Sequence, residues 1–273
     1  MFNLSKSTNV LIDAHIHIHE CYNLDKFFNS AKANFLKQAN ILDLCSNQFI
    51  LCLTESHKVN YFNQLKQNAD KSILSEWKID LTENPNTIKL VDKENFTIYL
   101  IAGRQIVTNE KLEVLTLGLI EDPEDGKPIE EILAYVSNKK VISVIPWGVG
   151  KWMGYRKEII EKLVLQNNTF PIYLGDNGNR PFFWSKPKIF SLAAKNNMLN
   201  IPGSDPLPFK NEVNKPGSFG FVLEGVLDIE KPFDSLFEKI TSSKKQFATY
   251  GRLESLFNFF KNQISMQIVK RNR

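Results

Sequence analysis

The sequence contains little cysteine and no long apolar run. Cys21, Cys45 and Cys52 are its only three cysteines, and no two of them form a C-x-x-C pair. This excludes a disulfide framework, and reduced thiols are expected. No apolar stretch approaches the roughly 20 residues that cross a bilayer, and the amino terminus lacks the basic and apolar parts of a signal peptide. We therefore expect a cytoplasmic protein with no membrane partner.

Neither positive nor negative charge dominates the chain. The 34 lysines and arginines exceed the 30 aspartates and glutamates by only four. Because this excess is small and scattered, it does not indicate a nucleic-acid partner. The 273 residues are 42% hydrophobic, which is enough for one sizeable core, and no linker or internal repeat divides them. We expect a single domain over residues 1–273.

Short apolar runs typical of strands alternate with amphipathic stretches along most of the chain. Strands are expected at residues 10–18, 49–54, 97–101, 113–119, 141–146, 171–174, 199–202 and 219–223. Helices are expected at 24–39, 129–136, 157–165, 190–195, 233–240 and 253–264, where apolar residues recur at helical spacing. The polar stretch 82–95 is expected to form a hairpin or an excursion. Repeated strand–helix alternation predicts a mainly parallel sheet with its helices outside.

Such a sheet can close into a barrel or stay open and doubly wound. An open sheet that binds a dinucleotide carries a Gly-rich loop after its first strand. Here the first strand runs into "HIHECYN", which contains no glycine. The fold class that we predict is therefore α/β, in the form of a TIM-like, distorted seven-stranded (β/α) barrel.

Histidine is rare, yet three of the four histidines lie within "LIDAHIHIHE" (11–20). Alternate residues of a strand point to the same face, so His15, His17 and His19 share one side with Asp13. Active sites of α/β barrels lie at the carboxyl ends of the strands, and two imidazoles there can hold one metal ion. A polar, exposed strand face is the alternative, but a first barrel strand has no side that faces solvent.

The stretch "IDAHIHIH" resembles the opening strand of metal-dependent hydrolases built on α/β barrels. Two groups share this opening, the PHP (polymerase and histidinol phosphatase) phosphoesterases and the amidohydrolases. Five later segments resemble motifs of the PHP group in the same order, namely "LCLTESH", "LIAGRQIVT", "EVLTLGL", "VISVIPWG" and "NIPGSDPLPF". The resemblance covers residues 10 to 225, so the chain resembles a PHP phosphoesterase with a degenerate metal site.

The resemblance implies that this metal site is reduced. PHP proteins gather histidines and acids around as many as three metal ions, and His15, His17 and Asp205 match that pattern. The positions where the family has further ligands hold Ser56, Gln105, Thr116, Ile145 and Leu207. We therefore expect one divalent ion, zinc, manganese or iron, on His15, His17 and Asp205. Glu55 or His57 would assist.

Several cations near the expected strand ends suit a phosphate ester, because they neutralise the charge on its oxygens. We assign Arg104, Lys151 and Arg180 to substrate binding, although each is also explained as an ordinary surface cation. Asp176 lies in "GDNGNRP", a turn-rich loop after a strand. We place it at the same site, although a plain turn explains it equally well.

The expected function is metal-dependent hydrolysis of a small phosphorylated molecule. The metal would activate water and polarise the phosphoryl oxygen, and Glu55 or Asp205 would accept a proton. Two alternatives remain open. One is an amidohydrolase-type reaction at a carbonyl group, and the other is a barrel that has lost catalysis and binds a ligand or a partner. The replaced ligand positions favour the second alternative, whereas the retained His-x-His favours an enzyme.

Overall fold

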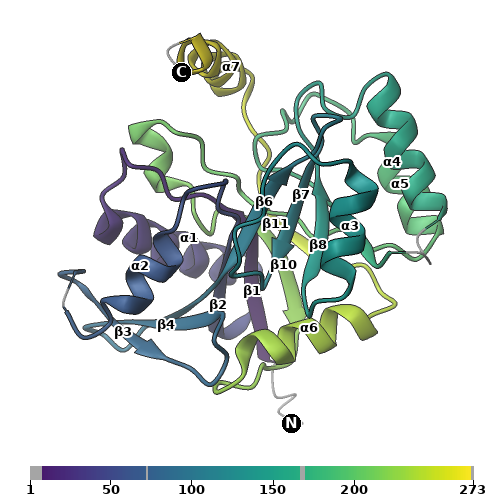
Figure 1. The fold of residues 1–273 in the computed structure, drawn as a ribbon. Helices are drawn as coiled ribbons and strands as arrows, with labels where there is room; N and C mark the ends of the chain where they lie inside the picture. Colours follow the sequence, from purple (N-terminus) through teal and green to yellow (C-terminus); the bar gives the residue numbers. More distant parts are fainter. Residues whose placement is uncertain (1–7, 72, 167–169, 272–273) are drawn as a thin grey trace, which may run out of the picture.

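Two mixed sheets, one of seven strands and one of four, form the scaffold. The computed structural model describes residues 8–71, 73–166 and 170–271 and is drawn in Figure 1. The strands are β1 (Thr8–Ile16), β2 (Cys45–Leu53), β3 (Trp77–Leu81), β4 (Thr87–Asp92), β5 (Thr97–Ile101), β6 (Gly103–Val107), β7 (Glu113–Leu117), β8 (Ile142–Pro146), β9 (Ile172–Gly175), β10 (Phe219–Glu224) and β11 (Ala248–Gly251). The orders are β11-β10-β1-β2-β5-β4-β3 and β6-β7-β8-β9.

Helices cover the outer faces of both sheets (Figure 1). Helix α1 begins after Asn23, whose side chain accepts a 2.8 Å hydrogen bond from the backbone N–H of Lys26 and so caps the first turn. Its apolar residues recur at helical spacing and are buried against the large sheet. The helices are α1 (Leu24–Ile41), α2 (Tyr61–Gln67), α3 (Ile129–Ser137), α4 (Tyr155–Leu165), α5 (Lys188–Lys195), α6 (Pro232–Ser242) and α7 (Leu256–Arg271), with a 3-10 helix at Lys210–Asn214.

A buried apolar cluster lies between the two sheets. It joins Ile12 of β1, Ile50 of β2 and Phe221 of β10 to Leu115 of β7 and Val144 of β8. Because β1 also packs against α1 on its other face, it is apolar on both sides, which explains its nearly continuous run of hydrophobic residues. The polar residues at the carboxyl end of this strand are therefore unusual, because the rest of the strand is apolar and buried.

The prediction of a seven-stranded, mainly parallel barrel is wrong. Among the described strands, the pairs β1–β2, β2–β5 and β8–β9 are parallel, and the other six pairs are antiparallel. Three of the antiparallel pairs, β3–β4, β4–β5 and β6–β7, are hairpins with no helix between their strands, and a tight turn allows only antiparallel pairing. The pairs β7–β8 and β10–β11 are antiparallel although a helix lies between their strands. The polar stretch 82–95 forms the turn after β3, the strand β4 and the turn before β5, so it belongs to a hairpin, as one of the two expectations for it proposed.

Short backbone contacts join the two sheets at the ends of β1 and β2. On one side, the N–H of Glu55 donates to the carbonyl of Gly103 at 3.0 Å. On the other side, the segment 199–205 lies between β9 and β1, where the N–H of Asp205 donates to the carbonyl of His15 at 2.8 Å. Residues 199–202, expected to be a strand, form only an isolated bridge to β9. These contacts bring the ends of β1 and β9 together.

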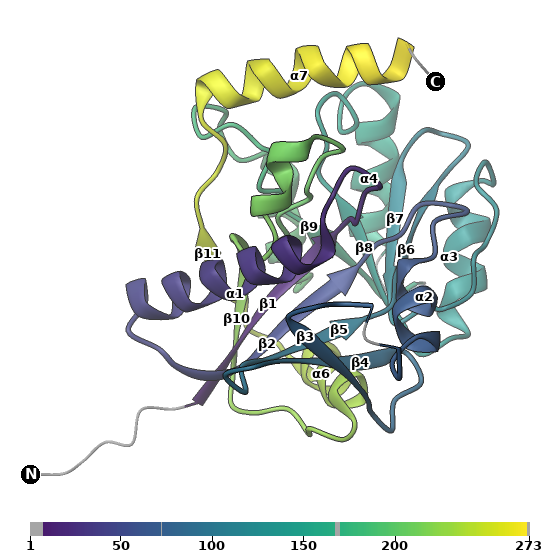
Figure 2. The same ribbon diagram turned by 90° about the vertical axis from the view of Figure 1, so that its left-hand side faces the viewer.

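Helix α7 lies at one end of the molecule, away from both sheets (Figure 2). Its Phe259 packs edge-on against Phe183 and Trp184, with ring centroids 6.1 Å from each. No helix within the described ranges is long and apolar enough to cross a membrane.

Candidate metal centre

His15 and His17 lie at the carboxyl end of β1 with their imidazoles side by side. Both are buried, and their Nε2 atoms are 3.0 Å apart. The two residues share a face because they are separated by one strand position. The alternation that the sequence shows is therefore preserved in the fold, and it points two nitrogen ligands at the same place.

Asp205 completes a compact group with these two histidines. Its Oδ1 lies 3.6 Å from the Nε2 atom of each imidazole, and the three ligand atoms lie within 4.8 Å of one another. The chain brings this residue to β1 through the 199–205 segment, which follows the small sheet. The structure thus gathers three of the residues that the sequence assigned to a metal, although one of them is far away in the chain.

A buried carboxylate holds the loop of Asp205 against β1. Asp13 accepts hydrogen bonds of 2.8 Å from the N–H groups of Ser204 and Gly217, and burial raises its pKa to about 7. Asp205 has a left-handed backbone, with φ of 52°, a conformation in which an aspartate is tolerated better than most residues. Gly203 lies so close to His15 that a Cβ would be 2.2 Å from its backbone nitrogen. Only glycine fits there.

Two asparagines from the loop after β9 hold the carboxylate of Asp205. Asn177 donates from Nδ2 to Oδ2 at 2.6 Å. Asn179 donates from Nδ2 to the same oxygen at 3.2 Å and to the backbone carbonyl of Asp205 at 2.7 Å. Lys215 in turn donates to Oδ1 of Asn179. Sequence analysis assigned no role to Asn179 or Lys215, and the only signal was the turn-rich "GDNGNRP" loop.

The electrostatics of the group suit a cation. Burial, and then repulsion from His15, lowers the pKa of His17 to about 3, so this imidazole is neutral at pH 7. Burial alone would raise the pKa of Asp205, but His15, His17 and the hydrogen bond from Asn177 hold it below its usual range. A neutral imidazole and an ionised carboxylate are the forms that coordinate metals.

The spacing of the three ligand atoms fits one ion. Ligands about 2.1 Å from a tetrahedral zinc lie about 3.4 Å apart, and the separations here are 3.0, 3.6 and 3.6 Å. Two imidazoles and one carboxylate are a donor set that zinc, manganese and ferrous iron accept. His15, His17 and Asp205 would therefore hold the metal through Nε2, Nε2 and Oδ1.

Gln105 lies near this group, where its side chain raises the pKa of His17 slightly against the larger effect of burial. It occupies the position where the PHP resemblance expects a bridging glutamate. A neutral amide is a weaker ligand for a divalent cation than a carboxylate. The structure therefore offers three strong ligands where a site for several ions needs more.

His57 does not belong to the group. Its Nδ1 lies 3.2 Å from Oδ1 of Asp122, and the ring is partly exposed. Glu55 is buried and faces away toward α2, where its Oε1 accepts a 3.1 Å hydrogen bond from the N–H of Phe62. Burial raises the pKa of Glu55 to about 7, although the nearby guanidinium of Arg104 lowers it.

The predicted substrate cations are each bound to protein groups. Arg104 donates to the carbonyls of Val59 and Ile120 at 2.6 and 2.9 Å and lies 3.6 Å from Glu55. Arg180 and Asp176 form a buried two-point ion pair with distances of 2.7 and 2.8 Å, and Lys151 pairs with Glu113. Arg180 and Asp176 neutralise each other, so the structure brings these two together for support of the loop after β9.

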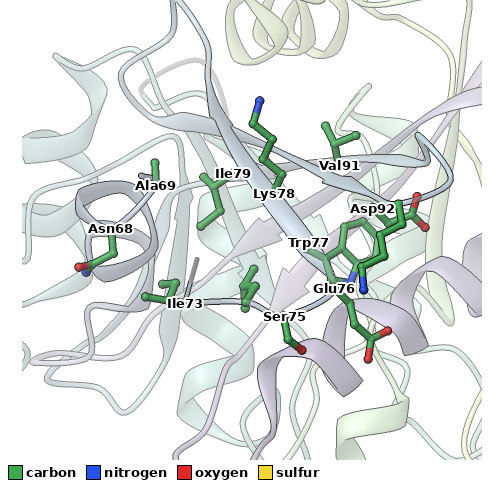
Figure 3. Close-up of a pocket in the computed structure, with 12 residues that line it drawn as sticks. Asn68, Ala69, Ile73, Ser75, Glu76, Trp77, Lys78, Ile79, Val91 and Asp92 are labelled. Carbon is green, nitrogen blue, oxygen red and sulfur yellow. The ribbon is translucent and has the colours of Figure 1, made fainter. Parts of the chain in front are cut away.

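Two cavities differ in their relation to the centre. One of about 570 Å³ opens beside His19 and is lined also by Lys58, Tyr61, Gln64 and Pro208. The ring of His19 stacks on that of His17 with centroids 5.8 Å apart, so this cavity adjoins the centre. The other, of about 300 Å³, lies at the β3–β4 hairpin around Trp77 (Figure 3) and contains none of the three ligands.

No family model and no curated protein matches the sequence. Solved structures share the fold at low identity. PsfC from Pseudomonas syringae is 11% identical with a TM-score of 0.60, over 96% of this chain and 99% of PsfC. The lesion-specific endonuclease PfuEndoQ from Pyrococcus furiosus is 13% identical with a TM-score of 0.56, over 89% and 59%. An endonuclease Q complex with a 27-mer duplex is 9% identical with a TM-score of 0.46, over 86% and 56%.

The likeness to PfuEndoQ supports the PHP resemblance at the level of the fold, since endonuclease Q has the PHP fold. It also corrects one expectation. PfuEndoQ is described as a lesion-specific endonuclease and shares this fold, which contradicts the expectation that no nucleic-acid partner is indicated. That expectation rested on the small net charge of the whole chain, whereas contacts to phosphates depend on the local placement of positive groups.

Proposed function

We propose that the protein is a metal-dependent hydrolase that cleaves phosphate esters. The observation that carries the proposal is the buried group of His15, His17 and Asp205, whose spacing fits one divalent ion. The fold shared with an endonuclease supports it, because nucleases cleave phosphate ester bonds.

The residues of the centre have two roles, because some would bind the cation and others orient its ligands. His15 and His17 would bind it through Nε2, and Asp205 through Oδ1, while Asn177 and Asn179 occupy Oδ2. When bound, a divalent ion supplies polarisation of a phosphoryl oxygen and a source of hydroxide at neutral pH. The asparagines fix the carboxylate, so that the oxygen facing the histidines keeps its lone pairs for the ion.

The cavity beside His19 is the substrate site that we propose. It adjoins the centre and carries Lys58, which is exposed and can neutralise a phosphate oxygen. Arg104 and Arg180 are already neutralised by carboxylates. We propose that Arg104, Arg180 and Glu55 support the walls of the site, since their side chains already bind other groups of the protein.

A protein that binds a ligand without catalysis is the second candidate, and Gln105 favours it. The amide beside His17 replaces the carboxylate that would bridge to a second ion. A single ion can stabilise only part of the charge that two ions share at the attacking and leaving oxygens. If the protein is an enzyme, we therefore expect slow turnover.

The test is an assay of protein purified without a histidine tag. Hydrolysis of p-nitrophenyl phosphate and bis(p-nitrophenyl) phosphate is followed with added manganese, zinc or ferrous iron. His17→Ala should abolish metal-stimulated hydrolysis, because it removes one of three ligands. His57→Ala is the matched control and should retain it, since His57 contacts Asp122 instead.

Hydrolysis of neither ester with any of the three metals would reject the enzymatic proposal and leave the binding candidate. Equal rates for wild type and His17→Ala would show that the activity arises elsewhere.

A further inference from the structure

Lys215 is a largely buried cation next to the metal centre. Its side chain is 13% exposed, and its Nζ lies 3.3 Å from Oε2 of Glu212 and 3.4 Å from Oε2 of Glu254. The two carboxylates neutralise it and fix its position. Its remaining contact is a hydrogen bond donated to Oδ1 of Asn179.

This contact decides which way the amide of Asn179 faces. An asparagine side chain has an acceptor on one side and a donor on the other. A lysine ammonium can only donate, so Oδ1 must face Lys215. The donor Nδ2 is then left to face Asp205, where it reaches both Oδ2 and the backbone carbonyl. With the amide reversed, an oxygen would face the carboxylate and repel it.

We propose that Lys215 is a positioning residue of the metal centre, which acts through Asn179 to hold the carboxylate of Asp205. The inference rests on the proposed metal site, but it concerns residues that do not touch the ion. Groups that orient a ligand in this way contribute about 10- to 100-fold to metal affinity.

The direct test compares two half-buried lysines. Affinity for zinc and manganese is measured by competition with a chromogenic chelator. Lys215→Met should weaken binding about tenfold. Lys32→Met is the matched control, because Lys32 also bridges two carboxylates, Asp92 and Glu94, and its side chain is 20% exposed. It should lower stability without changing metal affinity.

Two further variants separate positioning from general support of the fold. Lys215→Arg keeps a donor in place and should bind metal within about threefold of wild type. In an Asn179→Ala background, Lys215→Met should weaken metal binding little further, because the effects of coupled residues are not additive. Equal affinity of wild type and Lys215→Met, an equal loss in Lys32→Met, or full additivity with Asn179→Ala would overturn the inference. A wild type that binds no metal would instead overturn the proposed function.

Discussion

The side-chain amide of Asn177 donates a 2.6 Å hydrogen bond to Oδ2 of Asp205, while Oδ1 of the same carboxylate lies 3.6 Å from both histidine Nε2 atoms. One oxygen is thus held by the protein and the other faces the two imidazoles. This division is typical of a metal ligand that is oriented by a neighbouring group.

Removal of this hydrogen bond should weaken metal binding. Asn177→Ala removes the shorter of the two hydrogen bonds to Oδ2 and leaves only the 3.2 Å bond from Asn179. The carboxylate is then held less firmly against the histidines, and we expect about a 10- to 100-fold loss of zinc affinity by isothermal titration. Asn86→Ala is the control, since Asn86 is also a buried amide and donates to the carbonyl of Gly118. The account fails here if both variants bind zinc as the wild type does.

A carboxylate at position 105 should strengthen the site. The side chain of Gln105 lies near enough to His17 to affect its pKa, so Gln105→Glu places an anionic oxygen near the ligand group. We expect tighter binding of manganese and a second, weaker equivalent in titrations. Gln166→Glu, an exposed glutamine at the end of α4, controls for the added charge. Unchanged affinity in Gln105→Glu would show that this side chain does not approach the ion.

Gly203 should not tolerate a side chain. A Cβ there would be 2.2 Å from the backbone nitrogen of His15, so Gly203→Ala must push the Asp205 loop away from β1. We expect a loss of at least roughly 1–3 kcal/mol in the free energy of unfolding, with weaker metal binding. In Gly148→Ala the new methyl meets only the flexible side chain of Lys151, so that variant should stay close to wild type. Urea denaturation distinguishes the two.

Glu55 should make stability depend on pH in a defined direction. Burial raises its pKa from 4.5 to about 7 in the folded state. Between these values the folded state binds more protons than the unfolded state, so the free energy of unfolding falls as pH rises through this window. The contribution is roughly 3 kcal/mol.

Glu55→Gln cannot titrate, so its stability should fall less than that of the wild type between about pH 4.5 and 7. Urea denaturation across this range measures the difference. The same pH dependence in both proteins would contradict the assignment.

Local pattern predicts much of this fold, but not how its strands assemble. The sequence places a strand at 97–101, where β5 lies, and a helix at 24–39 within α1, because apolar spacing reports burial directly. The expected strands and helices miss β3, β6, β11 and α2. Alternation of strands and helices predicts parallel pairing, but hairpins without a helix are not recognised, and β7–β8 and β10–β11 pair antiparallel although a helix lies between their strands. The error in sheet topology follows from this.

In the candidate site too, local sequence patterns predict some residues, whereas contacts between distant residues are not predicted. His15 and His17 follow from alternation on one strand, and Asp205 from the family resemblance. The partners of charged residues are harder to predict. Arg104 is bound by carbonyls of residues 59 and 120, and Asn179 by a lysine 36 positions away. Such contacts depend on tertiary structure, so the sequence analysis assigned Arg104 and Arg180 to a substrate although carboxylates neutralise them in the fold.

Metal content measures the central claim most directly. Wild-type protein purified without a histidine tag, exposed to zinc or manganese and then freed of unbound ion, is analysed by plasma mass spectrometry beside His15→Ala, with folding checked by circular dichroism. The account predicts about one equivalent in the wild type, because three ligands surround one position, and almost none in the folded variant. Equal metal content in the two proteins, or none in either, would contradict it.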